Sequence, residues 1–438
     1  MTSSIEYLAG ILPDGATANA AGHLVVGGCD LVALAESHGT PLYVYDEATI
    51  RARARAFRDA LRGYPGRSTV CYAAKAYCAP WLLRIMAEEG LALDVVSGGE
   101  LHTAAVAGFA PERISFHGNN KTDDELEMAV RLRVGRVIVD NVEEIGRLAD
   151  RADAAGVRQG VLLRVSPGVT AQTHAYLQTG AVDTKFGFSP DAVGGAVKAV
   201  LARAALVLWG LHAHIGSQIG EIEPYAAAVE RLFALAQEIA KLGVDVREIS
   251  PGGGYAVRYR PSDPPADGPA MAGEVARMVA ESSRRHGFAR PPDLAIEPGR
   301  AVVATAGIAL YRVGSVKEIR GVRTYVAVDG GMADNIRPTA YGAEYTALLA
   351  GRAAAPAEQS VAIAGRYCES GDVLIREVRL PRPKPGEILA IPVSGAYHLS
   401  MASNYNLVPR PAVVVVRDGS SRLVRRRETY DAVLGAEV

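Results

Sequence analysis

The 438-residue sequence has few cysteines, no long apolar run and almost no net charge. Its four cysteines are irregularly spaced and form no C-x-x-C pair, which argues against a structural zinc site or a disulfide framework and favours a reducing cytoplasm. No apolar run reaches the roughly 20 residues of a membrane helix, and residues 1–6 lack the basic start of a signal peptide. A formal net charge of −1 gives no reason to expect a nucleic-acid or anionic-membrane partner.

Eight short apolar stretches recur between residues 69 and 297, and polar segments separate them. Apolar residues at three- and four-residue spacing predict helices in those segments, at 48–62, 79–89, 98–107, 122–132, 142–155, 189–203, 221–242 and 271–287. A strand–helix unit repeated eight times predicts a closed parallel (β/α)8 barrel of the TIM type. The span 41–300 is near the ~250 residues typical of such barrels.

The pattern changes after residue 300. Short β-branched stretches punctuated by glycine and proline predict a mostly antiparallel C-terminal β domain over residues 301–438. Residues 1–40 are expected to join that domain, because the barrel needs no further strand. The chain is therefore expected to form two domains.

Residues able to do chemistry follow nearly every apolar stretch, and in such a barrel the loops after the strands build the active site. Lys75 ends the first stretch, where an amine at the barrel mouth can form a Schiff base with an aldehyde. A surface lysine at a strand end is the alternative. Glu297, after the eighth stretch, could hold the ring nitrogen of a cofactor protonated or pair with Arg300.

Three consecutive glycines, Gly252, Gly253 and Gly254, follow the seventh stretch. Because glycine has no side chain, the main-chain N–H groups of this segment can approach an anion closely. The alternative is that the segment is only a flexible turn. Neither a dinucleotide-binding pattern nor a P-loop is present, so a generic phosphate cradle is the sharper prediction. Gly299 and Arg300 add an amide and a fixed positive charge at the next strand end, where these barrels commonly bind phosphate.

His212 and His214 alternate on the sixth strand, so their side chains are expected to face the same way. Such a pair could bind a metal ion, place one imidazole against an aromatic cofactor, or be purely structural. The combination is more informative than its members. A reactive lysine, a phosphate cradle, a flat histidine and a carboxylate for a ring nitrogen are together what pyridoxal 5'-phosphate requires, so we expect this cofactor and no metal.

With these motifs in place, the sequence resembles the barrel-fold pyridoxal-phosphate decarboxylases, and among them the diaminopimelate decarboxylase family. The segments that carry the resemblance are residues 72–75, 210–218, 252–254, 297–300, 368–370 and 403–406. It extends from about residue 25 to residue 435. It implies a barrel with a C-terminal β domain, a homodimer with shared active sites, and decarboxylation of meso-2,6-diaminoheptanedioate to L-lysine.

The resemblance also implies roles for individual residues. Lys75 would hold the cofactor's aldehyde, His214 would stack on its ring, and Ser217 with the three glycines would meet its phosphate. Further residues would bind or act on the substrate: Arg300, Arg337, Tyr341, Glu369, Tyr397 and Cys368. The first three would hold the distal carboxylate and Glu369 the distal amino group. Tyr397 would contact substrate and cofactor, and Cys368 of the partner chain would donate a proton after carbon dioxide leaves.

Several alternatives stay open. A related decarboxylase could act on ornithine, lysine, arginine or carboxynorspermidine, although Glu369 and Ser370 after the cysteine favour diaminopimelate. A barrel metallohydrolase using His212 and His214 is a different class, and a pyridoxal-phosphate carrier would not be an enzyme. Two departures from the family pattern bear on the substrate: His398, expected at the pocket rim in place of a small residue, and the stretch 171–185.

Overall fold

The computed structural model describes residues 4–169 and 184–437. Of the atypical stretch 171–185, all but residues 184 and 185 lie outside the described part. The chain divides into two compact units. The barrel unit comprises residues 53–256 and 266–301, and the β unit comprises residues 1–52, 257–265 and 302–438.

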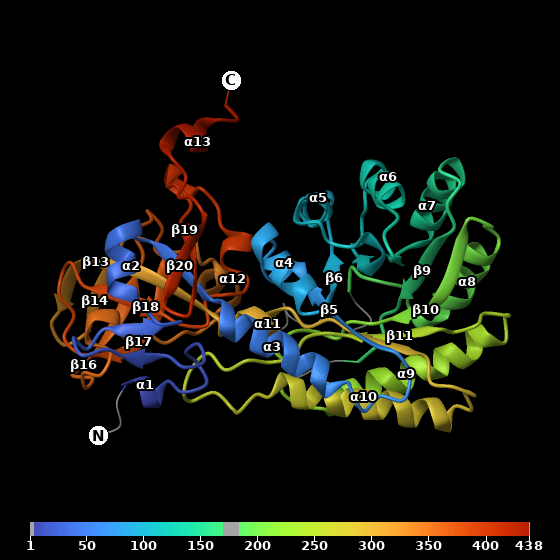
Figure 1. The fold of residues 1–438 in the computed structure, drawn as a ribbon, viewed down its shortest axis with the longest axis horizontal. Coiled ribbons are helices and arrows are strands. Elements are labelled where there is room, and N and C mark those ends of the chain that lie inside the picture. Colours follow the sequence, from blue (N-terminus) through green and yellow to red (C-terminus); the bar gives the residue numbers. More distant parts are fainter. Residues whose placement is uncertain (1–3, 170–183, 438) are drawn as a thin grey trace. The chain divides into compact units, whose positions relative to one another are not determined.

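The barrel unit is built on a closed ring of parallel strands, which confirms the predicted fold (Figure 1). The strands follow one another around the ring in chain order, and the last pairs with the first. Their bounds are β5 (Ser68–Ala73), β6 (Ala92–Val95), β7 (Ile114–Phe116), β8 (Arg136–Val139), β9 (Gln159–Arg164), β10 (Leu206–His212), β11 (Glu248–Gly252) and β12 (Asp293–Ile296). They are the eight apolar stretches recognised in the sequence.

Helices alternate with these strands and lie outside the ring (Figure 1). They are α3 (Glu47–Ala60), α4 (Pro80–Glu88), α5 (Gly98–Ala107), α6 (Asp123–Leu132), α7 (Val142–Ala154), α8 (Val193–Leu201), α9 (Glu223–Ala240) and α10 (Gly268–Arg285), with the short α11 (Arg300–Val303) after β12. Single 3₁₀ turns are η1 (Ala74–Ala76), η2 (Pro111–Arg113) and η4 (Pro190–Ala192). The predicted helices are confirmed to within a few residues at their ends.

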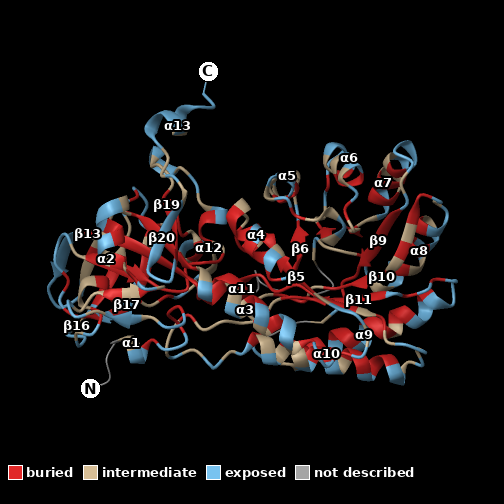
Figure 2. Cartoon of the chain, in the orientation of Figure 1, coloured by how far each residue is buried: buried red, intermediate tan, exposed pale blue. Residues whose placement is uncertain are grey.

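The barrel strands are almost entirely buried, whereas the longer helices α3 to α10 each expose one face (Figure 2). Many of the buried side chains are β-branched or aliphatic, as expected for a parallel sheet covered on its outer face, but polar side chains such as Asp94 and Glu248 are buried on these strands as well. Side chains in the loops after the strands cap the next helix: Ser97 accepts from the Glu100 amide at 3.2 Å, and Asn141 accepts from the Glu144 amide at 2.9 Å. Such caps fix short loops and therefore the direction of the residues that they carry.

The β unit contains a nine-stranded sheet and a separate three-stranded sheet. The small sheet consists of β1 (Thr17–Ala18), β2 (Leu24–Val26) and β3 (Cys29–Asp30). The large sheet consists of β4 (Leu42–Asp46), β13 (Gly307–Ile319), β14 (Arg323–Val328), β15 (Leu348–Leu349), β16 (Gln359–Ala364), β17 (Val373–Leu380), β18 (Ile388–Ile391), β19 (Ala412–Arg417) and β20 (Ser420–Arg425). Most neighbouring strands are antiparallel, but β14 with β16 and β4 with β19 are parallel.

The strand β4 shows where the predicted domain boundary differs from the structure. A boundary at residue 41 assigns β4 to the barrel, but β4 pairs with β13 and β19 and lies in the β unit. Its five residues are all buried, and β13 and β19 pair with it on its two edges. An apolar stretch of this kind fits either sheet equally well, and only the long-range pairing decides between them.

Short helices complete the β unit: α1 (Ser4–Tyr7), α2 (Leu31–His38), α12 (Arg337–Tyr341), α13 (Tyr430–Leu434), η5 (Ala350–Arg352), η6 (Leu399–Met401) and η7 (Tyr405–Leu407). Within residues 4–169 and 184–437, no helix is both long enough and apolar enough to cross a bilayer.

Candidate active site

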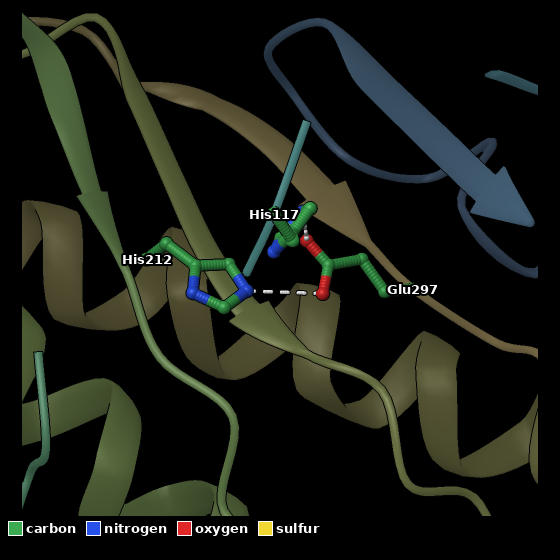
Figure 3. Close-up of side chains that lie close together, drawn as sticks. All are labelled: His117, His212 and Glu297. Carbon is green, nitrogen blue, oxygen red and sulfur yellow. Dashed lines mark hydrogen bonds and ion pairs between the residues drawn. The ribbon is translucent and has the colours of Figure 1, made fainter. Parts of the chain in front are cut away.

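Glu297 follows the end of β12 and is buried, with 7% of its surface exposed. Its Oε2 atom accepts a hydrogen bond from His212 Nε2 at 3.0 Å, and its Oε1 atom accepts one from the Ser250 hydroxyl at 3.2 Å. His212, which Figure 3 shows next to Glu297, ends β10, and Ser250 lies in β11. Two neighbouring strands therefore fix the direction of the carboxylate. Residues far apart in the sequence therefore meet at the C-terminal end of the barrel, as predicted.

The surroundings keep Glu297 ionised. Burial raises the pKa of this carboxyl, but the imidazoles of His212 and His117 lower the pKa more, so it lies well below that of an exposed glutamate. His117 Nε2 is 3.5 Å from Glu297 Oε1 and 3.6 Å from Asp94 Oδ1. Burial and the charge of Glu297 raise the pKa of Asp94 well above its ordinary value. The pKa values of these two neighbouring carboxyl groups are thus shifted in opposite directions.

Lys75 lies in η1, immediately after β5, and is half-buried. The buried Tyr72 hydroxyl donates to the Tyr77 carbonyl at 2.9 Å and closes the turn that carries the lysine. Burial, followed by the positive charge of Lys75, lowers the pKa of His214 well below its usual value. His214 is therefore neutral, and the ammonium group of Lys75 belongs to the same electrostatic environment at the strand ends.

The three glycines after β11 are not equivalent. The amide of Gly252 donates to Ser250 Oγ at 3.3 Å, and the amide of Gly253 donates to His214 Nδ1 at 3.3 Å. The amide of Gly254 donates no hydrogen bond within the part of the chain that the structure describes. Of the three amides expected to meet a phosphate, this is therefore the one whose hydrogen remains available to an anion.

Close backbone packing explains why this segment is made of glycine. A Cβ atom on Gly253 would lie 1.9 Å from the Glu297 carbonyl oxygen. On Gly254, which has a φ of +105°, it would lie 2.4 Å from the Gly216 carbonyl oxygen. Any side chain here would push apart the loops after β10, β11 and β12, and with them the carboxylate of Glu297.

Arg300 and Ser217, both predicted from the sequence, are in contact. Arg300 is buried and its Nη2 atom donates to Ser217 Oγ at 3.1 Å. Gly299 packs against Ala73, since a Cβ atom on this glycine would lie 3.0 Å from the carbonyl oxygen of Ala73. The end of β12 is thereby held against the end of β5, which leads into the turn of Lys75.

In the β unit, Arg337 lies in a cage of tyrosines and is 5% exposed. Its guanidinium carbon is 5.7 Å from the ring centres of Tyr259 and Tyr397 and 5.9 Å from that of Tyr341. Its Nε atom donates to the Tyr345 hydroxyl at 2.9 Å. The structure therefore brings together three predicted substrate residues, Arg337, Tyr341 and Tyr397, and adds two tyrosines that the sequence did not single out.

Cys368 and Glu369 lie on the turn between β16 and β17 and are exposed. The Cys368 amide donates to Asn406 Oδ1 at 3.1 Å, and the Gly371 amide donates to Glu369 Oε1 at 3.3 Å. The turn is thus fixed by its own hydrogen bonds while both side chains face outward. A thiol that donates a proton to a substrate needs this kind of access.

The prediction that His398 lies at a pocket rim is wrong. The side chain is buried, with 1% exposed, and both ring nitrogens contact tyrosine hydroxyls. A histidine fits there because Tyr43 and Tyr345, which come from distant parts of the chain, provide its hydrogen-bond partners. A reading of neighbouring residues alone does not reveal those partners.

Asp94 and His117 also lie in this group of strand-end residues, and the sequence predicts no role for them. Position at the end of a barrel strand was the available signal. His117, His212 and Glu297 also form a group whose ligand atoms lie within 4.8 Å of one another, which is the kind of cluster that can hold a metal ion (Figure 3). The metallohydrolase alternative paired His212 with His214, and the described residues form a different cluster.

These residues fit pyridoxal phosphate. A buried anionic carboxylate suits a protonated pyridine nitrogen, and the neutral His214 suits the face of an aromatic ring. Gly254 offers a main-chain amide that donates no hydrogen bond within the described residues. His117 Nε2 and Asp94 Oδ1 are buried and, within the described residues, have no hydrogen-bond partner. A (β/α)8 barrel with this set at its strand ends defines a barrel-fold pyridoxal-phosphate enzyme.

Comparisons with known proteins support this class and narrow it. A family described as "Pyridoxal-dependent decarboxylase, pyridoxal binding domain" matches residues 47–304. Diaminopimelate decarboxylase of Bacillus subtilis is 47% identical over 421 residues, which is 95% of each chain. A crystal structure of the M. jannaschii diaminopimelate decarboxylase in complex with L-lysine superposes with a TM-score of 0.90 at 31% identity, covering 97% of this chain and 98% of that one. The chain belongs to the diaminopimelate decarboxylase family.

Lysine/ornithine decarboxylase of Vibrio vulnificus, in complex with putrescine, superposes with a TM-score of 0.75 at 21% identity. The match covers 89% of this chain and 97% of that one. At this level of identity the likeness shows a shared fold.

Proposed function

We propose that the protein decarboxylates meso-2,6-diaminoheptanedioate at its D centre and releases L-lysine and carbon dioxide. The buried, tyrosine-caged Arg337 is the observation that best supports this substrate, because its guanidinium suits a carboxylate far from the reacting centre. The full-length similarity to diaminopimelate decarboxylases supports the same substrate.

Residues of the barrel unit would hold the cofactor. Lys75 would carry its aldehyde, His214 would lie on its ring, and Ser217 with the Gly254 amide would bind its phosphate. When bound, pyridoxal phosphate withdraws electrons from a bond at Cα of the substrate. Glu297 would hold a proton at the pyridine nitrogen, which a carboxylate oriented by two strands and kept anionic is suited to do.

Residues of the β unit would hold and protonate the substrate. Arg337 and Tyr341, with Arg300 of the barrel unit, would bind the distal carboxylate, and Glu369 the distal ammonium group. The Cys368 thiol would donate a proton to Cα after carbon dioxide leaves. We further propose a homodimer in which Cys368 acts on the substrate of its partner, and a cytoplasmic location, which the four free cysteines support.

Borohydride treatment of the purified enzyme is expected to fix the cofactor on Lys75. The reason is that Lys75 follows a strand end in the same electrostatic environment as His214 and Glu297. Peptide mapping should find the label on this lysine, and the protein should be yellow before treatment. Lys198, exposed on α8, is an internal control that should stay unlabelled. Label on any other lysine contradicts the assignment, and a colourless protein that contains zinc would favour the metallohydrolase.

Mixing inactive Lys75→Ala and inactive Cys368→Ala chains is expected to restore up to about a quarter of wild-type activity. Random pairing makes half of the dimers mixed, and each mixed dimer has one intact site of two. Activity should be measured under conditions that allow subunit exchange. As a control, Lys75→Ala mixed with the double variant provides no intact lysine and should restore nothing. If the first mixture also restores nothing although mixed dimers form, the shared-site proposal is wrong.

A further inference from the structure

His398 is a buried polar residue that the proposed chemistry does not use. Its Nε2 atom is 2.9 Å from the Tyr345 hydroxyl, and its Nδ1 atom is 3.2 Å from the Tyr43 hydroxyl. Both tyrosine rings meet the imidazole edge-on, with ring centres 5.3 Å and 5.8 Å away. Both nitrogens and both ring edges are therefore engaged, and the imidazole has one defined orientation.

The direction of the hydrogen bonds follows from Arg337. A guanidinium can only donate, so the Tyr345 oxygen accepts from Arg337 Nε. The Tyr345 proton can then be donated to His398 Nε2, and in that arrangement the imidazole carries its own proton on Nδ1. That proton goes to the oxygen of Tyr43, whose hydroxyl donates to the main-chain carbonyl of Asp334 at 3.0 Å. Donation runs one way along the whole chain, an arrangement in which each bond strengthens the next.

The chain of hydrogen bonds decides which atoms of Arg337 are available. Nε is tied to Tyr345, and within the described residues no other side-chain atom of Arg337 donates a hydrogen bond. The two terminal nitrogens can therefore both turn to one carboxylate. The rings of Tyr259 and Tyr397 limit how far the guanidinium can move. The position of the two terminal nitrogens therefore depends on the Tyr345 oxygen, and the position of that oxygen depends on its contact with His398.

We infer that His398, acting through Tyr345, is a positioning residue that holds the Arg337 guanidinium in place for the distal carboxylate of the substrate. This inference rests on the proposed function, which assigns that carboxylate to Arg337. His398 touches neither the substrate nor the reacting atoms in this account, so its loss should affect recognition of the carboxylate and leave the chemistry at Cα intact.

Two ligands show whether a variant affects recognition of the carboxylate in particular. L-Lysine keeps the amino-acid centre that Arg337 would bind, whereas 1,5-diaminopentane lacks the carboxylate. Binding of each to the cofactor-loaded enzyme can be measured by calorimetry. The His398→Phe and Tyr345→Phe variants should bind L-lysine about fivefold to tenfold more weakly, the usual worth of one hydrogen bond, and should bind 1,5-diaminopentane within about twofold of wild type. His398→Gln, which can still accept from Tyr345, should recover part of the affinity for L-lysine.

The matched control is Tyr45→Phe. Tyr45 is also buried on β4, and its hydroxyl donates to the Gly395 carbonyl at 3.0 Å. This variant loses a buried hydrogen bond of the same unit, so it should lose stability and leave the preference for L-lysine unchanged. If His398→Phe and Tyr345→Phe weakened the binding of both ligands equally, or of neither, this inference would be wrong and the proposed function would still stand. A wild-type enzyme that binds both ligands equally well would overturn the proposed function and the inference with it.

Discussion

Glu297→Gln is expected to lower kcat about a thousandfold, equivalent to ~4 kcal/mol of transition-state stabilisation, while cofactor binding weakens far less. Glutamine keeps the shape of the side chain and can still accept the hydrogen bond that His212 Nε2 donates at 3.0 Å. It lacks the negative charge that would hold a proton at the pyridine nitrogen. The measurements are kcat for diaminopimelate and a titration of the apoenzyme with pyridoxal phosphate, followed by absorbance.

Glu238→Gln is the matched control for this variant. Glu238 is exposed on α9 of the same unit, so the same change of one charge should leave kcat near wild type. Near-normal turnover of Glu297→Gln would show that the buried carboxylate serves only to hold neighbouring strands together. A loss of cofactor binding as large as the loss of kcat would point to the same structural role.

Arg337→Ala is expected to remove most of the discrimination between diaminopimelate and lysine as substrates. Lysine has no distal carboxylate, so the buried guanidinium would be left without its partner. Sites built around such a group can reject an analogue that lacks it by about 10⁴ in kcat/KM. The alanine variant should lose activity on diaminopimelate by a similar factor, while its activity on lysine changes little. The measurement is kcat/KM of the wild type and of Arg337→Ala for diaminopimelate and for lysine, determined in parallel.

Arg320→Ala is the control, because Arg320 is an exposed arginine of the same unit. It should keep both activities. If Arg337→Ala lowered both activities by the same factor, the arginine would act on the fold or on the cofactor, and the distal carboxylate would need another partner.

The barrel was predictable because its signals are local. Each strand is a short apolar stretch, each following segment has helical spacing, and the residues after β5, β10, β11 and β12 contain unusual lysine, histidine, glycine and glutamate motifs. Roles for Lys75, His214 and Glu297 could be predicted from those motifs and the family resemblance, because a parallel barrel brings all strand ends to one side. In the structure, Glu297 accepts hydrogen bonds from His212 and Ser250, so the ends of three barrel strands do lie together.

Other features depend on contacts between distant residues, and the sequence did not reveal them. β4 is an apolar strand that could have belonged to either unit, and its pairing with β13 and β19 decided the matter. His398 is buried because Tyr43, 355 residues earlier in the chain, meets its ring. Gly252 and Gly253 use their amides internally, which a run of three glycines does not indicate.

The central claim is that this barrel decarboxylates diaminopimelate. The direct test is carbon dioxide release from meso-diaminopimelate, L- and D-lysine, L- and D-ornithine and arginine, measured in parallel with one preparation of the cofactor-loaded enzyme. We expect diaminopimelate to exceed each of the others in kcat/KM by about 10⁴, with L-lysine as the product. If any other amino acid in this set were decarboxylated faster than diaminopimelate, the proposed substrate would be wrong.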